Sequence, residues 1–351
     1  MMAAVIDGKK RVELRELSIP ELKAGELLIR IEYCLLCTWE QRIYTGESST
    51  GLPFIAGHEA SGVVVKVSGA SKASEANPGV PVNFKVGDRV VFKTLDHCGH
   101  CSYCYQGYTN QCTGAAKKRS YDGIPGSGGL AQYIALEAGR VFPLSGDISL
   151  EEAAFTEPLA CCIHSVKRSG IEFGDNVVIV GCGIMGQLHS LLCRLKGARV
   201  IVVEPRQDRR ELAARLGAHL VIDPGRGEMI DQVFKLTGGE GVDVVFNTAA
   251  NPDIAKRSMA LLKKMGRMIF YGSFHPNKNI EIDPNQVHYS EIVITGSSGP
   301  ATGDFYQASR MLSYKLLPVK DFIYKIFDLS EINEAFEAAL SPQSYRVAVR
   351  L

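Results

Sequence analysis

The sequence predicts an α/β protein in which a β-rich N-terminal part precedes a doubly wound parallel sheet. Short strand-like segments, interrupted by Pro20 and Gly25, occupy the first 33 residues and leave no room for a crossover helix. From about residue 149, strand-like and helical segments alternate, which is typical of βαβ units. The expected strands of the parallel sheet are 176–181, 199–204, 219–223, 242–249, 267–273 and 291–299.

One unit of this alternation carries a specific motif. Val177–Val180 is a β-branched strand, and Gly181, Gly183 and Gly186 follow it as G-x-G-x-x-G at the start of a helical segment. In such a turn the backbone approaches a pyrophosphate at the helix N-terminus, and an acid about 20 residues later accepts from the ribose hydroxyls. Glu204 ends the next strand and has the right spacing. The sequence therefore predicts a dinucleotide-binding Rossmann domain.

Other residues are expected to contact the same dinucleotide. Ile184 and Met185 lie within the glycine motif. Residues 247–250 and 296–298 follow strands at their carboxyl ends, where open parallel sheets bind ligands. Thr248 and Ser297 are the side chains expected there to line the nicotinamide end of the site.

The domain boundaries follow from the change in pattern. Ser149, with Glu152 three residues later, is a capping box that opens a helical stretch. We expect a catalytic domain over 1–148, the Rossmann domain over 149–297, and a return to the first domain over 298–351, where a final strand-like stretch closes the chain. An exposed loop is expected over 68–84, which is rich in Ser, Ala, Gly and Pro.

Composition excludes several classes of protein. The 351 residues include 46% hydrophobic and 22% charged residues, with a net charge of +1. No block of like charge favours nucleic acid or an anionic membrane surface as a partner. The N-terminus lacks a signal-peptide pattern, and no apolar run is long enough to span a membrane. A cytoplasmic protein is expected.

Four of the ten cysteines lie within fifteen residues, as C-x2-C-x2-C-x7-C. In a reducing compartment such spacing favours metal binding over disulfides. Four thiolates complete a Zn²⁺ tetrahedron without an open position, so this site is expected to be structural. Surface thiols and an iron–sulfur cluster are the alternatives. The ligands are Cys98, Cys101, Cys104 and Cys112.

A catalytic zinc needs three protein ligands and one open position. The candidates are Cys37, His58, Glu59 and Glu157, which are scattered along the chain. Each also has an ordinary structural interpretation, as a core thiol, a turn histidine or a surface carboxylate. Their residue types alone leave this choice open.

Taken in order, these motifs resemble the zinc-containing medium-chain dehydrogenase/reductase family, in particular its sorbitol (polyol) and threonine dehydrogenase branch. The resemblance rests on Cys37, the triplet 57–59, the cysteine lobe (about 95–115), the stretch 157–164 and the glycine turn. It covers essentially the whole chain. It implies a GroES-like catalytic domain beside the Rossmann domain, with the active site in the cleft between them.

The resemblance also implies roles for individual residues. Cys37 and His58 become ligands of a catalytic zinc, in addition to the structural one. Glu59 and Glu157 match positions whose carboxylates ligate this metal or hold its bound water, and both assignments stay open. Arg209 matches a position that flanks the adenosine ribose.

The expected cofactor is NAD, because a carboxylate at Glu204 would repel the 2′-phosphate of NADP. Arg206, just beyond it, keeps NADP as the less favoured alternative.

The sequence departs from the family at the proton relay. Many members have Ser or Thr two residues after the first zinc cysteine, and some have His five residues after it. Trp39 and Arg42 occupy these places, and Glu40 stands where Asp is usual. Indole only donates and guanidinium stays protonated, so neither accepts a proton. Thr38 and the two carboxylates of the metal site are the remaining candidates.

The expected function is hydride transfer between NAD and a secondary alcohol or polyol. Threonine-specific members tend to have Gly-Asn after the Leu of the Glu-Pro-Leu motif, whereas this chain has Ala160 and Cys161. L-Threonine or another alcohol, or a non-catalytic nucleotide-binding relic, are the alternatives. The partners expected are a small-molecule substrate and copies of the chain in a homodimer or homotetramer.

Overall fold

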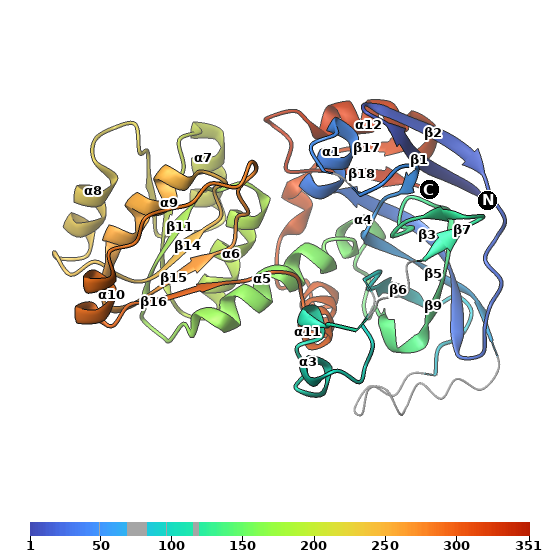
Figure 1. Cartoon of the computed structure of the whole chain (residues 1–351), viewed down its shortest axis with the longest axis horizontal. Coiled ribbons are helices and arrows are strands. Elements are labelled where there is room, and N and C mark those ends of the chain that lie inside the picture. Colours follow the sequence, from blue (N-terminus) through green and yellow to red (C-terminus); the bar gives the residue numbers. More distant parts are fainter. Residues whose placement is uncertain (49, 69–82, 96, 115–118) are drawn as a thin grey trace. The chain divides into compact units, whose positions relative to one another are not determined.

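The structure is a computed structural model that describes residues 1–48, 50–68, 83–95, 97–114 and 119–351 (Figure 1). The described chain forms two compact units. Unit 1 comprises Met1–Ala160 and Ala301–Leu351, and unit 2 comprises Cys161–Pro300. The loop expected over 68–84 falls largely on 69–82, outside the described residues.

Unit 1 is built on a seven-stranded sheet with the order β10-β6-β5-β3-β18-β17, in which β9 also pairs with β3. The C-terminal strand β18 lies between β3 and β17, so strands from both ends of the chain share one sheet. The bounds are β3 (Glu26–Leu36), β5 (Glu59–Val67), β6 (Arg89–Phe92), β9 (Tyr133–Glu137), β10 (Val141–Pro143), β17 (Ile323–Asp328) and β18 (Arg346–Arg350).

Two small sheets and several helices complete unit 1. The sheets consist of β1 (Met2–Gly8), β2 (Arg11–Glu16) and β4 (Phe54–Ile55), and of β7 (Ser120–Tyr121) and β8 (Ile124–Pro125). The helices are α1 (Thr38–Thr45), α3 (Ser102–Tyr105), α4 (Leu150–Ala153), the start of α5 (Thr156–Ser169), α11 (Thr302–Ser313) and α12 (Ile332–Ala339).

The helical stretch expected from Ser149 is present but divided into α4 and α5. The Ser149 side chain accepts a hydrogen bond from the Glu152 backbone, as the capping box predicts. The boundary between the compact units lies further on, within α5, between Ala160 and Cys161. The helical periodicity thus begins in one unit and ends in the other.

Unit 2 contains a six-stranded parallel sheet with the order β13-β12-β11-β14-β15-β16, which confirms the doubly wound α/β fold (Figure 1). Its strands are β11 (Asn176–Val180), β12 (Arg199–Val203), β13 (Leu220–Ile222), β14 (Val242–Asn247), β15 (Leu262–Phe270) and β16 (Val293–Gly296). Its other helices are α6 (Ile184–Leu195), α7 (Gln207–Arg215), α8 (Met229–Leu236), α9 (Pro252–Ser258) and α10 (Pro284–Ser290).

Helices cover both faces of this sheet. On β14, Val245 joins an apolar cluster with Met229 and Val233 of α8, while the neighbouring Phe246 contacts the His189 ring of α6. Successive side chains of a strand point to opposite faces, so α8 and α6 lie on different sides. Every residue of β14 is buried, as expected for a central strand of a parallel sheet.

None of the helices formed by the described residues combines the length and the apolar character that crossing a bilayer requires.

Helix α12 holds the C-terminal part of unit 1 on its core. Its buried residues Ile332, Ala335, Phe336 and Ala339 form one apolar stripe at helical spacing. The Phe336 ring stacks on Tyr44 of α1, with 4.7 Å between ring centroids. This contact therefore joins segments almost 300 residues apart.

We expect Phe336→Ala to lower the free energy of unfolding of unit 1 by about 3–5 kcal/mol, because it leaves a cavity in the core. Trp39, the single tryptophan, lies in unit 1 and reports its urea unfolding by fluorescence. Leu316→Ala, at a half-exposed position of the same unit, is the control and should change stability by less than about 0.5 kcal/mol. Equal losses in the two variants would contradict the packing assigned to α12.

Candidate metal centres and dinucleotide site

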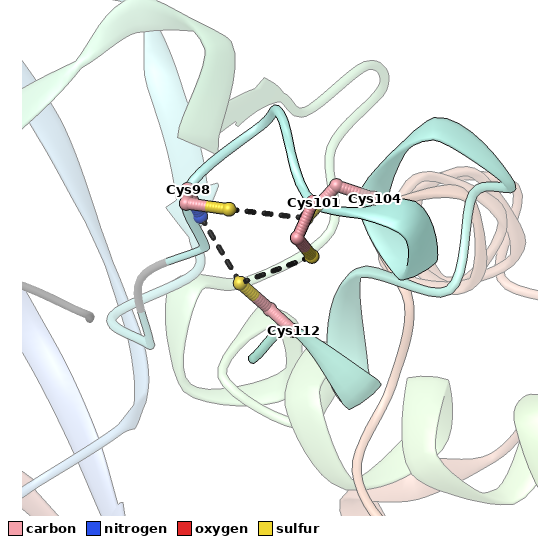
Figure 2. Close-up of side chains that lie close together, drawn as sticks. All are labelled: Cys98, Cys101, Cys104 and Cys112. Atoms are coloured by element: carbon pink, nitrogen blue, oxygen red, sulfur yellow. Dashed lines mark hydrogen bonds between the residues drawn. The ribbon is translucent and has the colours of Figure 1, made fainter. Parts of the chain in front are cut away.

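The four clustered cysteines converge on one point. The sulfur atoms of Cys98, Cys101, Cys104 and Cys112 all lie within 4.8 Å of one another, from the turn before α3, from α3 itself and from the segment after it (Figure 2). The Cys98–Cys104 and Cys101–Cys112 sulfur pairs are 4.0 and 3.9 Å apart. A tetrahedron with Zn–S bonds of about 2.3 Å has edges of about 3.8 Å, so this set fits Zn²⁺.

The ionisation of these thiols also suits a cation. Backbone N–H groups, chiefly those of Cys104 and Thr113, lower the pKa of Cys101 to about 5. Burial and the neighbouring thiols raise the pKa of Cys104 to about 12. Four thiolates at these distances repel one another, and a divalent cation removes that repulsion.

Cys37 and His58 also meet. Cys37 caps the N-terminus of α1, directly after β3, and His58 precedes β5, which pairs with β3. Their Sγ and Nε2 atoms are 3.6 Å apart. Bonds of about 2.3 Å to sulfur and about 2.0–2.1 Å to nitrogen in a tetrahedron require about this separation. The pair therefore fits a shared metal ion.

A third group at this point, Glu40, was not given a role by the sequence. It is fully buried, and its Oε1 lies 2.5 Å from Nδ1 of His58. The carboxylate also accepts hydrogen bonds from the Cys37 and Gly57 backbones. By holding Nδ1, Glu40 leaves Nε2 directed at Cys37, which is how outer carboxylates orient metal-binding histidines. Its position three residues after Cys37 was the signal available in the sequence.

Two further carboxylates lie next to His58. His58, Glu59 and Glu157 each offer one possible ligand atom, and these three atoms all lie within 4.8 Å of one another. Glu59 is buried and makes a two-point ion pair with Arg346 of β18, at 2.8 and 2.9 Å. Burial alone would lower the pKa of Arg346, but attraction to Glu59 raises it, so the guanidinium stays charged. Glu157 lies in the first turn of α5.

Trp39, which occupies one of the usual relay positions, packs beside the candidate metal ligands. The Trp39 ring contacts the His58 ring edge-on, at 5.5 Å between centroids, and Phe54 at 5.7 Å. Its backbone N–H donates to the Cys37 sulfur at 3.2 Å. Thr38 is exposed at the first position of α1. An indole therefore forms one wall beside the candidate ligands.

In unit 2, the glycine turn is tightly constrained. Gly181 has φ of +86°, and a Cβ at Gly186 would collide with the Gly181 carbonyl oxygen. The Thr248 hydroxyl donates to that carbonyl at 2.8 Å. Thr248 thus supports the turn itself. Ile184 and Met185 form the first residues of α6, with Gly183 as its N-cap.

The acid expected at the ribose is also connected to the turn. Glu204 is 3% exposed, and its carboxylate accepts hydrogen bonds from the Cys182 and Arg206 backbones at 2.7 and 3.0 Å. The Arg209 side chain lies beside Gly183, 3.7 Å from where a Cβ would stand there. Each carboxylate oxygen keeps a further acceptor site, so ribose hydroxyls can still bind.

Polar atoms at the carboxyl ends of two strands have no hydrogen-bond partner among the described residues. These atoms are Nδ2 and Oδ1 of the fully buried Asn247 and the hydroxyl oxygen of Ser297. Buried polar groups are normally satisfied, so these mark where a ligand or water belongs. Asn247 is the last residue of β14 and Ser297 directly follows β16, at the edge of the sheet where the dinucleotide is expected.

We expect Arg346→Met to destabilise unit 1 by about 3–5 kcal/mol, because it leaves the Glu59 carboxylate buried without a counter-ion. Arg350→Met, four residues on in the same strand, breaks an exposed ion pair with Asp328 and should cost much less stability, because solvent screens such pairs. Urea unfolding followed by Trp39 fluorescence compares the two. Similar losses of unfolding free energy in the two variants would contradict the large cost expected for breaking the buried Glu59–Arg346 pair.

Comparison with known proteins gives consistent matches. The family model for the alcohol dehydrogenase GroES-like domain matches residues 23–146, and that for the zinc-binding dehydrogenase domain matches residues 185–314. D-Arabitol-phosphate dehydrogenase of Enterococcus avium is 30% identical over 97% of this chain and 94% of its own length. Sorbitol dehydrogenase of Halalkalibacterium halodurans is 30% identical over 93% of each.

A solved structure extends this likeness to three dimensions. It is that of a protein provisionally assigned as a zinc-binding dehydrogenase from Sinorhizobium meliloti 1021, with NADP bound. The TM-score is 0.89 at 27% identity, and the alignment covers 100% of this chain and 99% of that one.

Proposed function

The chain belongs to the zinc-containing medium-chain dehydrogenase/reductase family and is an oxidoreductase of alcohols, and we propose that it transfers a hydride between NAD and a secondary alcohol or polyol. The observation that carries the proposal is the 3.6 Å separation of Cys37 Sγ and His58 Nε2, which matches two bonds to one zinc ion.

We assign Cys37, His58 and Glu157 as the residues that would hold this ion. Both oxygens of Glu59 accept hydrogen bonds from Arg346, which makes Glu59 the weaker candidate ligand, and a ligand atom of Glu157 lies within 4.8 Å of one of His58. Thiolate, imidazole and one carboxylate are a ligand set that suits Zn²⁺. The cysteine lobe would hold a second, structural ion.

When bound, zinc supplies Lewis acidity that favours loss of the alcohol proton, and NAD accepts the hydride. The chain's own residues would orient the metal ligands and hold the dinucleotide. Glu40 fixes the His58 ring through Nδ1, and Trp39 covers one side of it. The glycine turn and Glu204 would bind the pyrophosphate and ribose, with Arg209 beside them. Thr248 would keep the turn in shape, and Ser297 would line the nicotinamide end.

The proton then needs a route to water. Trp39 and Arg42 cannot accept it. Both oxygens of the buried Glu59 are occupied by hydrogen bonds from Arg346, whereas the Thr38 hydroxyl is exposed and can both accept and donate. We assign Thr38 as the group that passes the proton to solvent.

The relatives support a polyol as the substrate, because two of them at 30% identity are named for a polyol or a polyol phosphate. An assembly of two or four copies and a cytoplasmic location remain predictions. Light scattering of the purified protein tests the first.

His58→Asn should remove one of two zinc ions per chain and lower kcat/KM for polyol oxidation at least 10³-fold, because the metal loses a ligand and the alcohol its activation. Zinc is counted by mass spectrometry and activity is followed as NADH formation on polyols, 2,3-diols and L-threonine. His288→Asn, at an exposed position of α10, should change neither. One zinc per chain and no turnover in the unaltered protein would instead indicate the relic.

Cys104→Ser should also remove one zinc ion, while the Cys37 and His58 pair keeps the other. We expect lower stability of unit 1, since the lobe has few apolar residues and folds around its metal. Cys161→Ser, outside the cysteine lobe, is the control and should keep two ions per chain. A lobe that retains its zinc without Cys104 would refute the four-sulfur site.

The preference for NAD is tested by comparing kcat/KM for NAD⁺ and NADP⁺. Glu204 should make NAD⁺ favoured by at least about tenfold, because its carboxylate repels a 2′-phosphate. The solved structure from Sinorhizobium meliloti holds NADP, so a dinucleotide with a 2′-phosphate can bind to a protein of this fold. A higher kcat/KM with NADP⁺ would overturn the assignment.

A further inference from the structure

Two arginines that follow Glu204 are each paired with an aspartate at the ribose end of the proposed dinucleotide site. Arg206 is the N-cap of α7, and its backbone N–H donates to the Glu204 carboxylate at 3.0 Å. Its guanidinium makes two hydrogen bonds to the Asp208 carboxylate, Nε to Oδ1 at 3.1 Å and Nη2 to Oδ2 at 2.7 Å. The guanidinium of Arg206, two residues after Glu204, is therefore paired with a second carboxylate, that of Asp208.

A second arginine is neutralised in the same way. Arg210 donates to the Glu204 and Pro205 carbonyl oxygens, at 2.7 and 2.6 Å, and pairs with Asp223 at 2.9 Å. That pair is largely buried, with side-chain exposures of 12% and 20%, whereas Asp208 is 58% exposed. Replacing the exposed Asp208 side chain can therefore break the Arg206 pair without disturbing a buried ion pair.

We infer that Asp208 is a cofactor-specificity residue, which neutralises Arg206 and so keeps it from binding the 2′-phosphate of a nicotinamide dinucleotide. The inference rests on the proposed dinucleotide site. Arginine binds phosphate by the same fork that it presents to a carboxylate, so one partner excludes the other. The Arg206 guanidinium also lowers the pKa of Asp208, which keeps the competing charge in place at neutral pH.

This role differs from that of Glu204. Glu204 is expected to accept from the ribose hydroxyls and repel a phosphate directly. Asp208 is a positioning residue that acts through Arg206. Removing its charge should improve the binding of a 2′-phosphate while leaving the ribose contacts of NAD⁺ unchanged.

The test measures dissociation constants of the full-length protein for NAD⁺ and NADP⁺ by calorimetry. Asp208→Asn should lower the ratio of Kd for NADP⁺ to Kd for NAD⁺ by about 2- to 5-fold, within the range expected of one exposed charge pair. The Kd for NAD⁺ should change less than about twofold, and the drop should shrink at high salt.

Two further variants make the test specific. Glu228→Gln removes a carboxylate from another exposed arginine pair of unit 2, with Arg257 at 2.6 Å, and should leave the ratio unchanged. Arg206→Met combined with Asp208→Asn should abolish the gain in NADP⁺ binding, because the guanidinium that would bind the 2′-phosphate is absent.

An unchanged ratio in Asp208→Asn, an equal change in Glu228→Gln, or a gain that survives Arg206→Met would overturn the inference. Failure of the proposed cofactor has a different signature. Tighter binding of NADP⁺ than NAD⁺ by the unaltered protein would refute NAD preference, while the shift caused by Asp208→Asn would still measure the role of that residue.

Discussion

The hydrogen bond between Glu40 and His58 is the interaction on which the metal site depends. It fixes which imidazole nitrogen faces Cys37, and the same carboxylate holds the backbone on either side, at Cys37 and Gly57. A buried carboxylate is costly unless it is hydrogen-bonded, and both oxygens of Glu40 accept hydrogen bonds. Three segments, the end of β3, the start of α1 and the turn before β5, are thereby held in one geometry.

Glu59, the next residue after His58, extends this arrangement across the sheet. Its two-point pair with Arg346 joins β5 to β18, so the C-terminal strand contributes a charge beside the candidate ligands. The ion pair also distinguishes Glu59 from Glu157, to which the family resemblance gave the same possible roles. Glu59 is held by an arginine within the protein, whereas Glu157, which lies close to both Glu59 and His58, comes from the start of a helix.

The sequence predicted those features that local pattern determines. The six strands of unit 2 and the glycine turn follow from β-branched runs, helical periodicity and glycine spacing, all within short stretches of chain. Cys37, His58 and Glu157 were candidates by residue type, but only the family resemblance gave them a role at one metal site, because 21 to 120 residues separate them and no periodicity links them. The contact of Glu40 with His58, the ion pair of Arg346 with Glu59 and the hydrogen bond of Thr248 to the glycine turn were not predicted. They depend on which distant backbone groups meet after the sheets form.

The position of β18 between β3 and β17 has a consequence for synthesis on the ribosome. Unit 2 is continuous in sequence and can fold as soon as residues 161–300 have emerged. The sheet of unit 1 lacks one of its central strands until residue 350 is translated. Until then Glu59 has no counter-ion, and the nascent chain carries the thiols of its first half on an unfinished sheet. The domain that begins the chain is therefore the last to be completed.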